Sequence, residues 1–195
     1  MPLGANKAAI MATAGVSTAD VVLIQSQTAT SDASLSFTSG IDSTYGEYIF
    51  KFYNIGPESD AAYFSMNFST DGGSNYNMTK TSTYFKTLHT ESNDTALVAY
   101  DTGWDNAEAT GVQFLIVNNE NDADSACAGE LHLFNPSSTT YVKHWYSRFS
   151  AVHSSPAAND NFSAGYINST SDVDAVQFKW TSGDFDGTIK MWGVK

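Results

Sequence analysis

The chain has 195 residues, of which 42% are hydrophobic and 13% aromatic, and its formal net charge is −12 at pH 7. This apolar content is sufficient for one sizeable core and argues against global disorder. The 9 lysines and arginines are scattered and form no basic stripe. We therefore expect no binding to nucleic acid and no attraction to an anionic membrane surface.

Residues 1–17 differ from the rest of the chain because they are rich in alanine. They could form a short helix with a small apolar face made of Leu3, Ile10 and Met11. A helix of so few turns is marginal in water unless it packs against a partner. We interpret the segment as an N-terminal anchoring arm that another subunit clamps; a frayed terminus is the alternative.

The first residues show no Lys/Arg-rich region and no long apolar stretch, so we expect neither a secretory signal nor a membrane span. Cys127 is the single cysteine, which leaves no partner for an intrachain disulfide. Its neighbours are small or apolar, and we predict a buried structural thiol rather than a nucleophile. Both features are typical of a protein made in a reducing cytosol.

From residue 18 to residue 195 the chain alternates short strand-like runs with turn clusters, and we interpret this part as one domain. Alternating apolar and polar residues predict strands with one buried and one wet face. The first run is entirely apolar and predicts a strand that is covered on both faces. The predicted strands cover residues 21–24, 34–37, 47–54, 61–69, 76–89, 97–101, 112–118, 127–135, 140–153, 161–168, 174–181 and 187–194.

Turn signals predict how some of these strands are joined. Residues 135–138, with the sequence Asn-Pro-Ser-Ser, predict a type I turn that makes a hairpin of the runs on either side. Two glycine-containing loops, at 70–75 and 182–187, predict hairpins in the same way. The number and spacing of the strands predict an all-β fold, an antiparallel two-sheet sandwich of jelly-roll type with a short N-terminal arm or helix.

The histidines and one acidic loop are the candidates for metal binding. His132 and His144 lie on the strands of one predicted hairpin, but neither they nor His89 and His153 show a metal-ligand motif, and we favour cross-strand packing. The Asn/Asp-rich loop at 118–124 offers oxygen ligands for a hard cation, yet it lacks the glycine and distal glutamate of an EF-hand. We favour a solvated loop and predict no metal and no cofactor.

No arrangement typical of an enzyme stands out in the sequence. Glu47 and Glu130 lie in strand-like runs, but nothing brings them together as the paired carboxylates of a glycosidase. There is also no Gly-x-Ser-x-Gly elbow for a serine hydrolase. We therefore expect no catalytic residues and interpret the chain as a binding or structural protein.

The loop around Trp104 is the candidate for ligand contact. Trp104 lies among glycine, aspartate and asparagine residues, where burial of an indole ring is hard to arrange. Together with Tyr100, Asp101 and Asp105 it could stack on the apolar face of a sugar and hold the sugar's hydroxyl groups. The alternative, which we favour, is that Trp104 folds back and caps one end of the sandwich.

Four segments of the chain carry a resemblance through their order and spacing: 41–48 (IDSTYGEY), 69–73 (STDGG), 130–139 (ELHLFNPSST) and 187–193 (GTIKMWG). Together they resemble a family of structural proteins of tailed bacteriophages, especially marine and cyanobacterial phages. Residues 3–11 are similar to an opening found on phage virion proteins whose bodies are lectin-like β-domains.

The resemblance implies a jelly-roll fold and incorporation into the virion, as a capsid decoration or an appendage subunit, with no catalytic residues to transfer. We expect the protein on the outer surface of the particle after assembly in the host cytoplasm. Its partners would be other virion proteins, reached through the arm at 1–17, and further copies of itself in a trimer. A carbohydrate-binding, lectin-like module that adheres to host surface glycans is the alternative function.

Overall fold

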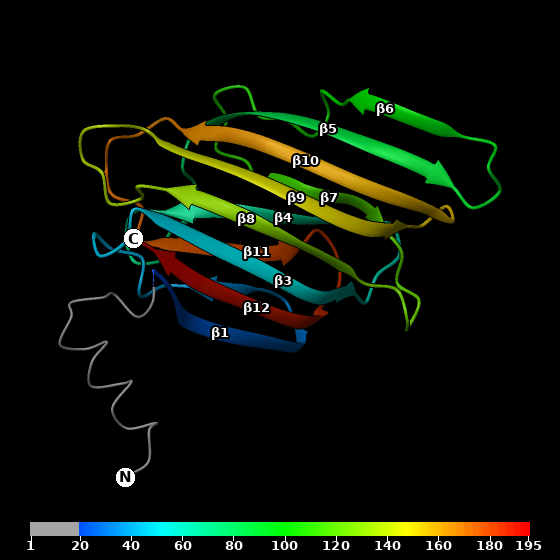
Figure 1. Ribbon diagram of the computed structural model, residues 1–195, viewed down its shortest axis with the longest axis horizontal. Coiled ribbons are helices and arrows are strands. Elements are labelled where there is room, and N and C mark those ends of the chain that lie inside the picture. The colour runs from blue at the N-terminus through cyan, green and yellow to red at the C-terminus, as the bar shows by residue number, and fades with distance from the viewer. Residues whose placement is uncertain (1–19) are drawn as a thin grey trace, which may run out of the picture.

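The computed structural model describes residues 20–195, whose regular secondary structure is entirely β-strand (Figure 1). Every strand pair within this range is antiparallel. The twelve strands of residues 20–195 are β1 (Val21–Asp32), β2 (Leu35–Phe37), β3 (Glu47–Pro57), β4 (Ala62–Ser69), β5 (Lys80–Thr90), β6 (Ala96–Tyr100), β7 (Gln113–Asn119), β8 (Cys127–Phe134), β9 (Lys143–His153), β10 (Ala157–Ile167), β11 (Ala175–Trp180) and β12 (Phe185–Val194).

The first and last strands of the described chain lie side by side. β1 pairs with β12, and Val21 lies opposite Val194. The predicted anchoring arm at 1–17 falls outside the described residues. Between residues 20 and 195 no helix is long and apolar enough to cross a membrane.

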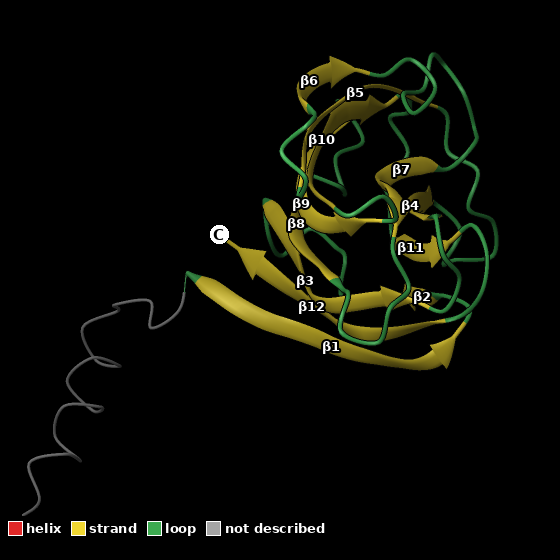
Figure 2. Cartoon of the chain, turned by 90° about the vertical axis from the view of Figure 1, so that its right-hand side faces the viewer, coloured by secondary structure: helices red, strands yellow, loops and turns green. Residues whose placement is uncertain are grey.

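The strands form two layers that face each other (Figure 2). One layer contains β1-β12-β3-β8 and the other is β7-β4-β11-β2. The chain crosses between layers from β1 to β2, from β3 to β4, from β7 to β8 and from β11 to β12, which is the strand order of a jelly roll. A single residue pair, Asn119 with His153, joins β7 to β9, so the sandwich is nearly a closed barrel. The predicted all-β antiparallel sandwich is confirmed.

Two inserted hairpins lengthen the first layer. β5 and β6 lie in sequence between β4 and β7, and β9 and β10 lie between β8 and β11. In space they follow β8 in the order β9-β10-β5-β6 (Figure 1). These four strands, which we call the extension, carry the first layer beyond the jelly roll itself.

Aromatic side chains fill the space between the two layers of the jelly roll. The ring centroid of Phe52 lies 5.8 Å from that of Phe64, 4.8 Å from Phe149 and 5.0 Å from Phe178. None of these four residues is more than 2% exposed. Burial of such large apolar surfaces is the dominant favourable contribution to folding.

The extension buries polar side chains beside apolar ones, and Phe149 of β9 reaches the aromatic core from it. Gln113 of β7 is fully buried there, and its Oε1 accepts hydrogen bonds from Ser82 Oγ at 2.6 Å and from Asn106 Nδ2 at 2.9 Å. Across β9 and β10, the hydroxyl oxygens of Ser147 and Ser163 are 2.6 Å apart. Since a buried polar group is costly unless it is hydrogen-bonded, this interior depends on these hydrogen bonds.

Two of the three predicted hairpins are wrong. β4 pairs with β7 and β11, and residues 76–79, which follow the loop at 70–75, form no strand. Near the loop at 182–187, β11 and β12 lie in different layers. Turn residues reverse the chain direction, but in a jelly roll they also carry the chain from one layer to the other. The hairpin at 135–138 is confirmed, because β8 pairs with β9 and the turn closes with a 3.0 Å hydrogen bond from Ser138 N to Asn135 O.

The prediction for the first strand is also wrong, whereas that for the cysteine is confirmed. The strand runs through Val21–Asp32 rather than 21–24, and Val21 and Leu23 are 49% and 43% exposed. An apolar run at the edge of a sheet keeps one wet face, which its composition does not reveal. Cys127 is buried, its Sγ donates to the Ile55 carbonyl oxygen at 3.1 Å, and burial raises the pKa of its thiol.

Candidate functional site

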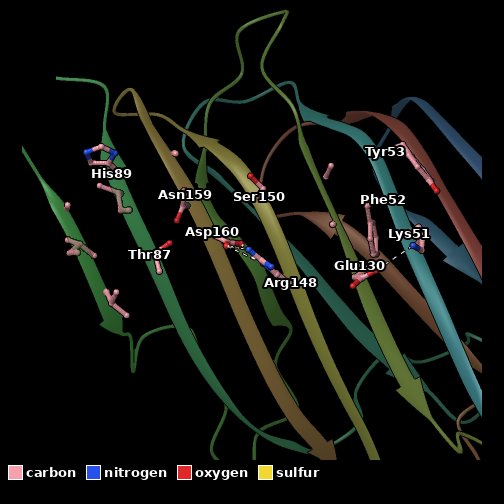
Figure 3. A pocket seen from close by; sticks show the side chains of 17 residues that line it. Lys51, Phe52, Tyr53, Thr87, His89, Glu130, Arg148, Ser150, Asn159 and Asp160 are labelled. Atoms are coloured by element: carbon pink, nitrogen blue, oxygen red, sulfur yellow. Dashed lines mark hydrogen bonds and ion pairs between the residues drawn. The ribbon is translucent and has the colours of Figure 1, made fainter. Parts of the chain in front are cut away.

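A groove of about 920 Å³ crosses the outward face of the first layer (Figure 3). Residues of six neighbouring strands line it, in the spatial order β3, β8, β9, β10, β5 and β6. Four of these strands belong to the extension. The inserted hairpins therefore supply most of the surface on which a ligand could lie.

Small side chains make the floor of the groove. Ala128, Ser150, Asp160 and Thr87 lie opposite one another on β8, β9, β10 and β5, and Val98 of β6 continues the row. Successive residues of a strand point to opposite faces, so the strand register alone sets which side chains share this row. Alanine, serine and threonine leave the space above the sheet open.

Longer side chains form the neighbouring row. Lys51, Glu130 and Arg148 lie opposite one another on β3, β8 and β9, and Phe162 and Phe85 continue the row on β10 and β5. Lys51 Nζ lies 3.6 Å from Glu130 Oε2. The rings of Phe162 and Phe85 stack with 4.6 Å between their centroids. Of this row, Lys51, Glu130 and Arg148 line the groove, and their length beside the short side chains of the floor hollows it out.

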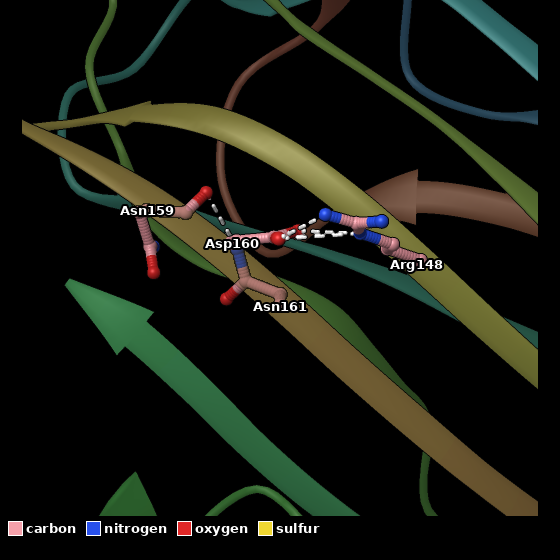
Figure 4. A network of polar contacts seen from close by, with 4 residues as sticks. All are labelled: Arg148, Asn159, Asp160 and Asn161. Carbon is pink, nitrogen blue, oxygen red and sulfur yellow. Dashed lines mark hydrogen bonds and ion pairs between the residues drawn. The ribbon is translucent and has the colours of Figure 1, made fainter. Parts of the chain in front are cut away.

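A bidentate ion pair occupies the central strands of the groove (Figure 4). Arg148 Nη2 donates to Asp160 Oδ2 at 2.7 Å, and Arg148 Nε donates to the same oxygen at 3.2 Å. These hydrogen bonds raise the pKa of the Arg148 guanidinium above its ordinary value. The Arg148 side chain is 65% exposed and carries further N–H groups, so it can donate to a ligand while it holds Asp160.

Buried asparagines on either side of Asp160 hold β10 in place. Asn159 Nδ2 donates to the Val117 carbonyl oxygen of β7 at 3.1 Å. Asn161 Oδ1 accepts a hydrogen bond from the Tyr84 hydroxyl of β5. Because these two asparagines point inward, the residue between them points into the groove.

Exposed apolar side chains lie at both ends of the groove. At the β3 end, Tyr53 is 42% exposed, and Lys190 Nζ lies 5.3 Å from the centroid of its ring. At the β6 end, Leu97 is 40% and Val98 is 75% exposed. The groove thus combines apolar ends with hydrogen-bonding groups at its centre.

Such a combination suits a ligand that has both hydroxyl groups and apolar patches. Aromatic and aliphatic side chains can pack on the C–H faces of a sugar ring. Carboxylates accept hydrogen bonds from sugar hydroxyls, and guanidinium and ammonium groups donate to them. Apolar surface with a few oriented polar groups is also the general pattern of ligand sites.

The four predicted sugar-contact residues lie outside this groove, on β6 and the loop that follows it. The ring centroid of Trp104 lies 4.7 Å from that of Tyr63 and 5.3 Å from that of Phe114, and Trp104 is half-buried. Its ring packs on β4 and β7, as it would in a loop that caps the sandwich.

The other three predicted residues, Tyr100 of β6 and two aspartates of the loop, pair with neighbours. The Tyr100 hydroxyl donates to Asp105 Oδ2 at 2.6 Å. Asp101 Oδ2 lies 3.6 Å from Lys86 Nζ. Tyr100 is 54% exposed, and its exposed fraction is the highest of the four residues.

The predicted metal candidates are spread over the molecule. The His132 ring stacks on that of Tyr146 of β9, with 4.5 Å between the ring centroids. His132 Nδ1 lies 2.5 Å from Glu47 Oε1. His89 lies elsewhere and lines the groove. In the loop at 118–124, Glu120 Oε2 accepts a hydrogen bond from Ser125 Oγ. Within residues 20–195 no three His, Cys, Asp or Glu residues are arranged to hold a metal ion.

Sequence reasoning missed the groove, although part of its signal was present. Tyr53 and Arg148 each occupy a solvent-facing position of a predicted strand. A single aromatic residue or a single arginine at such a position belongs to no recognisable sequence motif. The order β8-β9-β10-β5-β6 joins strands that are far apart in sequence, and no turn signal predicts it.

The β-sandwich by itself does not determine a function, because the same architecture hosts many unrelated ones. The groove and its side chains therefore carry the functional argument. Comparisons of the chain with family models, with curated proteins and with solved structures found no match.

Proposed function

We propose that this chain is a non-enzymatic virion structural protein of a tailed bacteriophage, whose β-sandwich binds carbohydrate through the groove on its outward face. The observation that carries the binding role is the groove itself, with Tyr53, the Lys51–Glu130 pair and the Arg148–Asp160 pair in one hollow. In this proposal the protein is a capsid decoration or appendage subunit on the outside of the particle.

The charge pairing in the groove favours binding over hydrolysis. Glu130 pairs with Lys51, and Asp160 pairs with Arg148. A glycosidase needs one carboxylic acid that stays protonated, which an apolar pocket or a second carboxylate provides. Carboxylates that pair with cations serve instead as fixed acceptors for hydroxyl groups.

The virion role rests on the resemblance, and three of the resembling segments come together in the fold. Asn135 N donates to the Gly46 carbonyl oxygen at 2.7 Å, which joins 130–139 to 41–48. Gly193 lies opposite Tyr48, and a Cβ at Gly193 would meet the ring of Tyr45. These positions thus support one another physically, which is a reason for them to occur together in a family.

A glycan array tests the binding role. The intact protein is expected to bind at least one glycan, and Tyr53→Ala and Arg148→Ala are expected to remove that binding without a change in β-sheet circular dichroism. Tyr141→Ala is the matched control, because Tyr141 is 73% exposed and lies outside the groove. Release of reducing ends from the bound glycan would contradict the non-enzymatic role.

Particle assembly tests the structural role. We propose that Leu3, Ile10 and Met11 anchor a trimer of the protein to other virion proteins. Substitution of all three by serine in the full chain is expected to leave a folded protein that no longer joins particles, as seen by immunoblotting of purified virions. Normal loading of this variant would refute the anchor, and a monomer in analytical ultracentrifugation would refute the trimer.

A further inference from the structure

We infer that the ligand of the groove is an extended, uncharged polysaccharide that lies across the strands and is bound through internal sugar units. This inference rests on the proposed carbohydrate-binding function and adds the class of ligand, its direction and its mode of binding. Three features of the groove carry it: its span, its open end and its balance of charge.

The span of the groove exceeds what a single sugar needs. Its lining residues come from six neighbouring strands. Neighbouring strands lie about 4.8 Å apart, so five intervals between them give a length of about 24 Å. That length accommodates several consecutive sugar units, with Tyr53 at one end and Val98 at the other.

In the part of the chain that the structure describes, no strand lies beyond β6 to enclose that end of the groove. Within residues 20–195, β6 pairs only with β5 and is the last strand of the layer. Val98, which ends the floor row, is 75% exposed. A site for a terminal sugar needs side chains that close around the last unit, whereas a polymer that continues past β6 needs an open end such as this one.

The carboxylates and cations that line the groove form two opposite pairs, and Lys190 lies outside the lining, over the ring of Tyr53. Lys51 pairs with Glu130, and Arg148 pairs with Asp160. An anionic polymer would have to compete with both carboxylates for these cations, in a protein whose net charge is −12. The pairing does not lower the affinity of the groove for a neutral polymer, because the hydroxyl groups of such a polymer can donate to the carboxylates and accept from the cations.

Native affinity electrophoresis of the full chain tests the class of ligand. The gels contain neutral polymers (hydroxyethylcellulose, galactomannan, laminarin) or anionic ones (alginate, dextran sulfate). Retardation by at least one neutral polymer is expected, and it should persist in added salt, because screening weakens only charge-driven binding. Retardation by the anionic polymers alone would overturn the uncharged class.

Titration calorimetry with a length series of the retarding polymer, from the monosaccharide to the hexasaccharide, tests the mode of binding. Affinity is expected to rise with length. Tyr53→Ala and Val98→Ser, at opposite ends of the groove, should each weaken binding of the longest oligomer by about tenfold, the equivalent of one lost packing contact. The shortest oligomer that binds should respond to only one of them.

Other results separate this inference from the function on which it rests. Equal affinity for the monosaccharide and the hexasaccharide would overturn the extended mode and leave carbohydrate binding intact. A blank glycan array together with no retardation by any polymer would overturn the carbohydrate-binding function itself. Val98→Thr, which keeps the shape of the side chain, should weaken binding less than Val98→Ser does; an equal loss would overturn a packing role for Val98.

Discussion

The jelly roll and its extension belong to the same sheet, yet their interiors are built from different chemistry. Between the layers of the jelly roll, rings such as Phe52 and Phe64 pack with centroids 5.8 Å apart. Beneath the extension, Gln113 and Asn161 are fully buried in hydrogen-bonded networks. Apolar burial, which does not depend on the direction of a contact, stabilises the first interior. Hydrogen bonds, which require a defined distance and angle, stabilise the second.

This difference suits the roles that we assign to the two regions. The groove needs side chains at defined positions on its floor and wall, and directional contacts beneath it fix the strands that carry them. Asp160, for example, stands between the buried Asn159 and Asn161. We therefore expect core substitutions in the jelly roll to cost more stability than substitutions in the polar interior of the extension.

The largest expected effect comes from the jelly-roll core. Phe52→Ala should lower the free energy of unfolding by about 3–5 kcal/mol, because it removes a ring that contacts three others and leaves a cavity. Urea denaturation measures this change. The matched control is Phe85→Ala on the outer face of the extension, where the side chain is 41% exposed. An equal loss in both variants would break the contrast between the two regions.

The polar interior of the extension should respond to the loss of a single hydrogen-bonding group. Gln113→Ala should lower the free energy of unfolding by about 1–3 kcal/mol, since buried donors lose their acceptor. Gln113 Nε2 also donates to the Trp104 carbonyl oxygen at 3.2 Å, so the near-ultraviolet circular dichroism of Trp104 should change. If Gln113→Leu proved more stable than the wild type, the hydrogen bonds would not be what holds this interior.

A buried lysine makes part of this interior sensitive to pH. Lys80 is 0% exposed, and burial lowers the pKa of its ammonium from 10.5 to about 8. Between these two values the unfolded chain holds a proton at Lys80 that the folded protein does not. The contribution of Lys80 to the free energy of unfolding therefore rises with pH across this window.

Denaturation of the wild type and of Lys80→Met at several pH values from about 7 to 10 tests this dependence. The wild type should gain stability relative to Lys80→Met as the pH rises. Lys86→Met is the control, because Lys86 pairs with Asp101 near the surface. A stability difference that stays constant with pH would mean that Lys80 is not protonated differently in the two states.

The smallest expected effect on stability comes from the groove. Arg148→Ala removes an exposed ion pair and should change the free energy of unfolding by about 1 kcal/mol or less. Carbohydrate binding should be lost in the same variant, as the groove proposal requires. A large loss of stability would show that Arg148 serves the fold rather than a ligand.

The sequence predicted the strands better than their partners. The predicted run at 127–135 matches β8 closely, because alternation of apolar and polar residues is a local property. Pairing depends on the whole fold. The loop at 70–75 has the residues of a hairpin turn, yet β4 pairs with β7 and β11. The order β10-β5 joins strands about 80 residues apart, for which no local signal exists.

The candidate site was still harder to predict. Trp104 stands out in the sequence because of its loop, but its ring packs against Tyr63 and Phe114. The floor of the groove consists of residues such as Ala128 and Ser150, which attract no notice singly. They make a site only because the register of β8 and β9 sets them opposite each other.

Nuclear magnetic resonance mapping of a bound oligosaccharide tests the central claim most directly. The probe is the neutral oligosaccharide that binds most tightly in the length series. Binding in the groove predicts that backbone amide signals shift along β3, β8, β9, β10, β5 and β6, and that those of the Trp104 loop remain in place. Shifts confined to the loop from Asp101 to Asp105, or to the surface around Tyr141, would contradict the groove as the binding site.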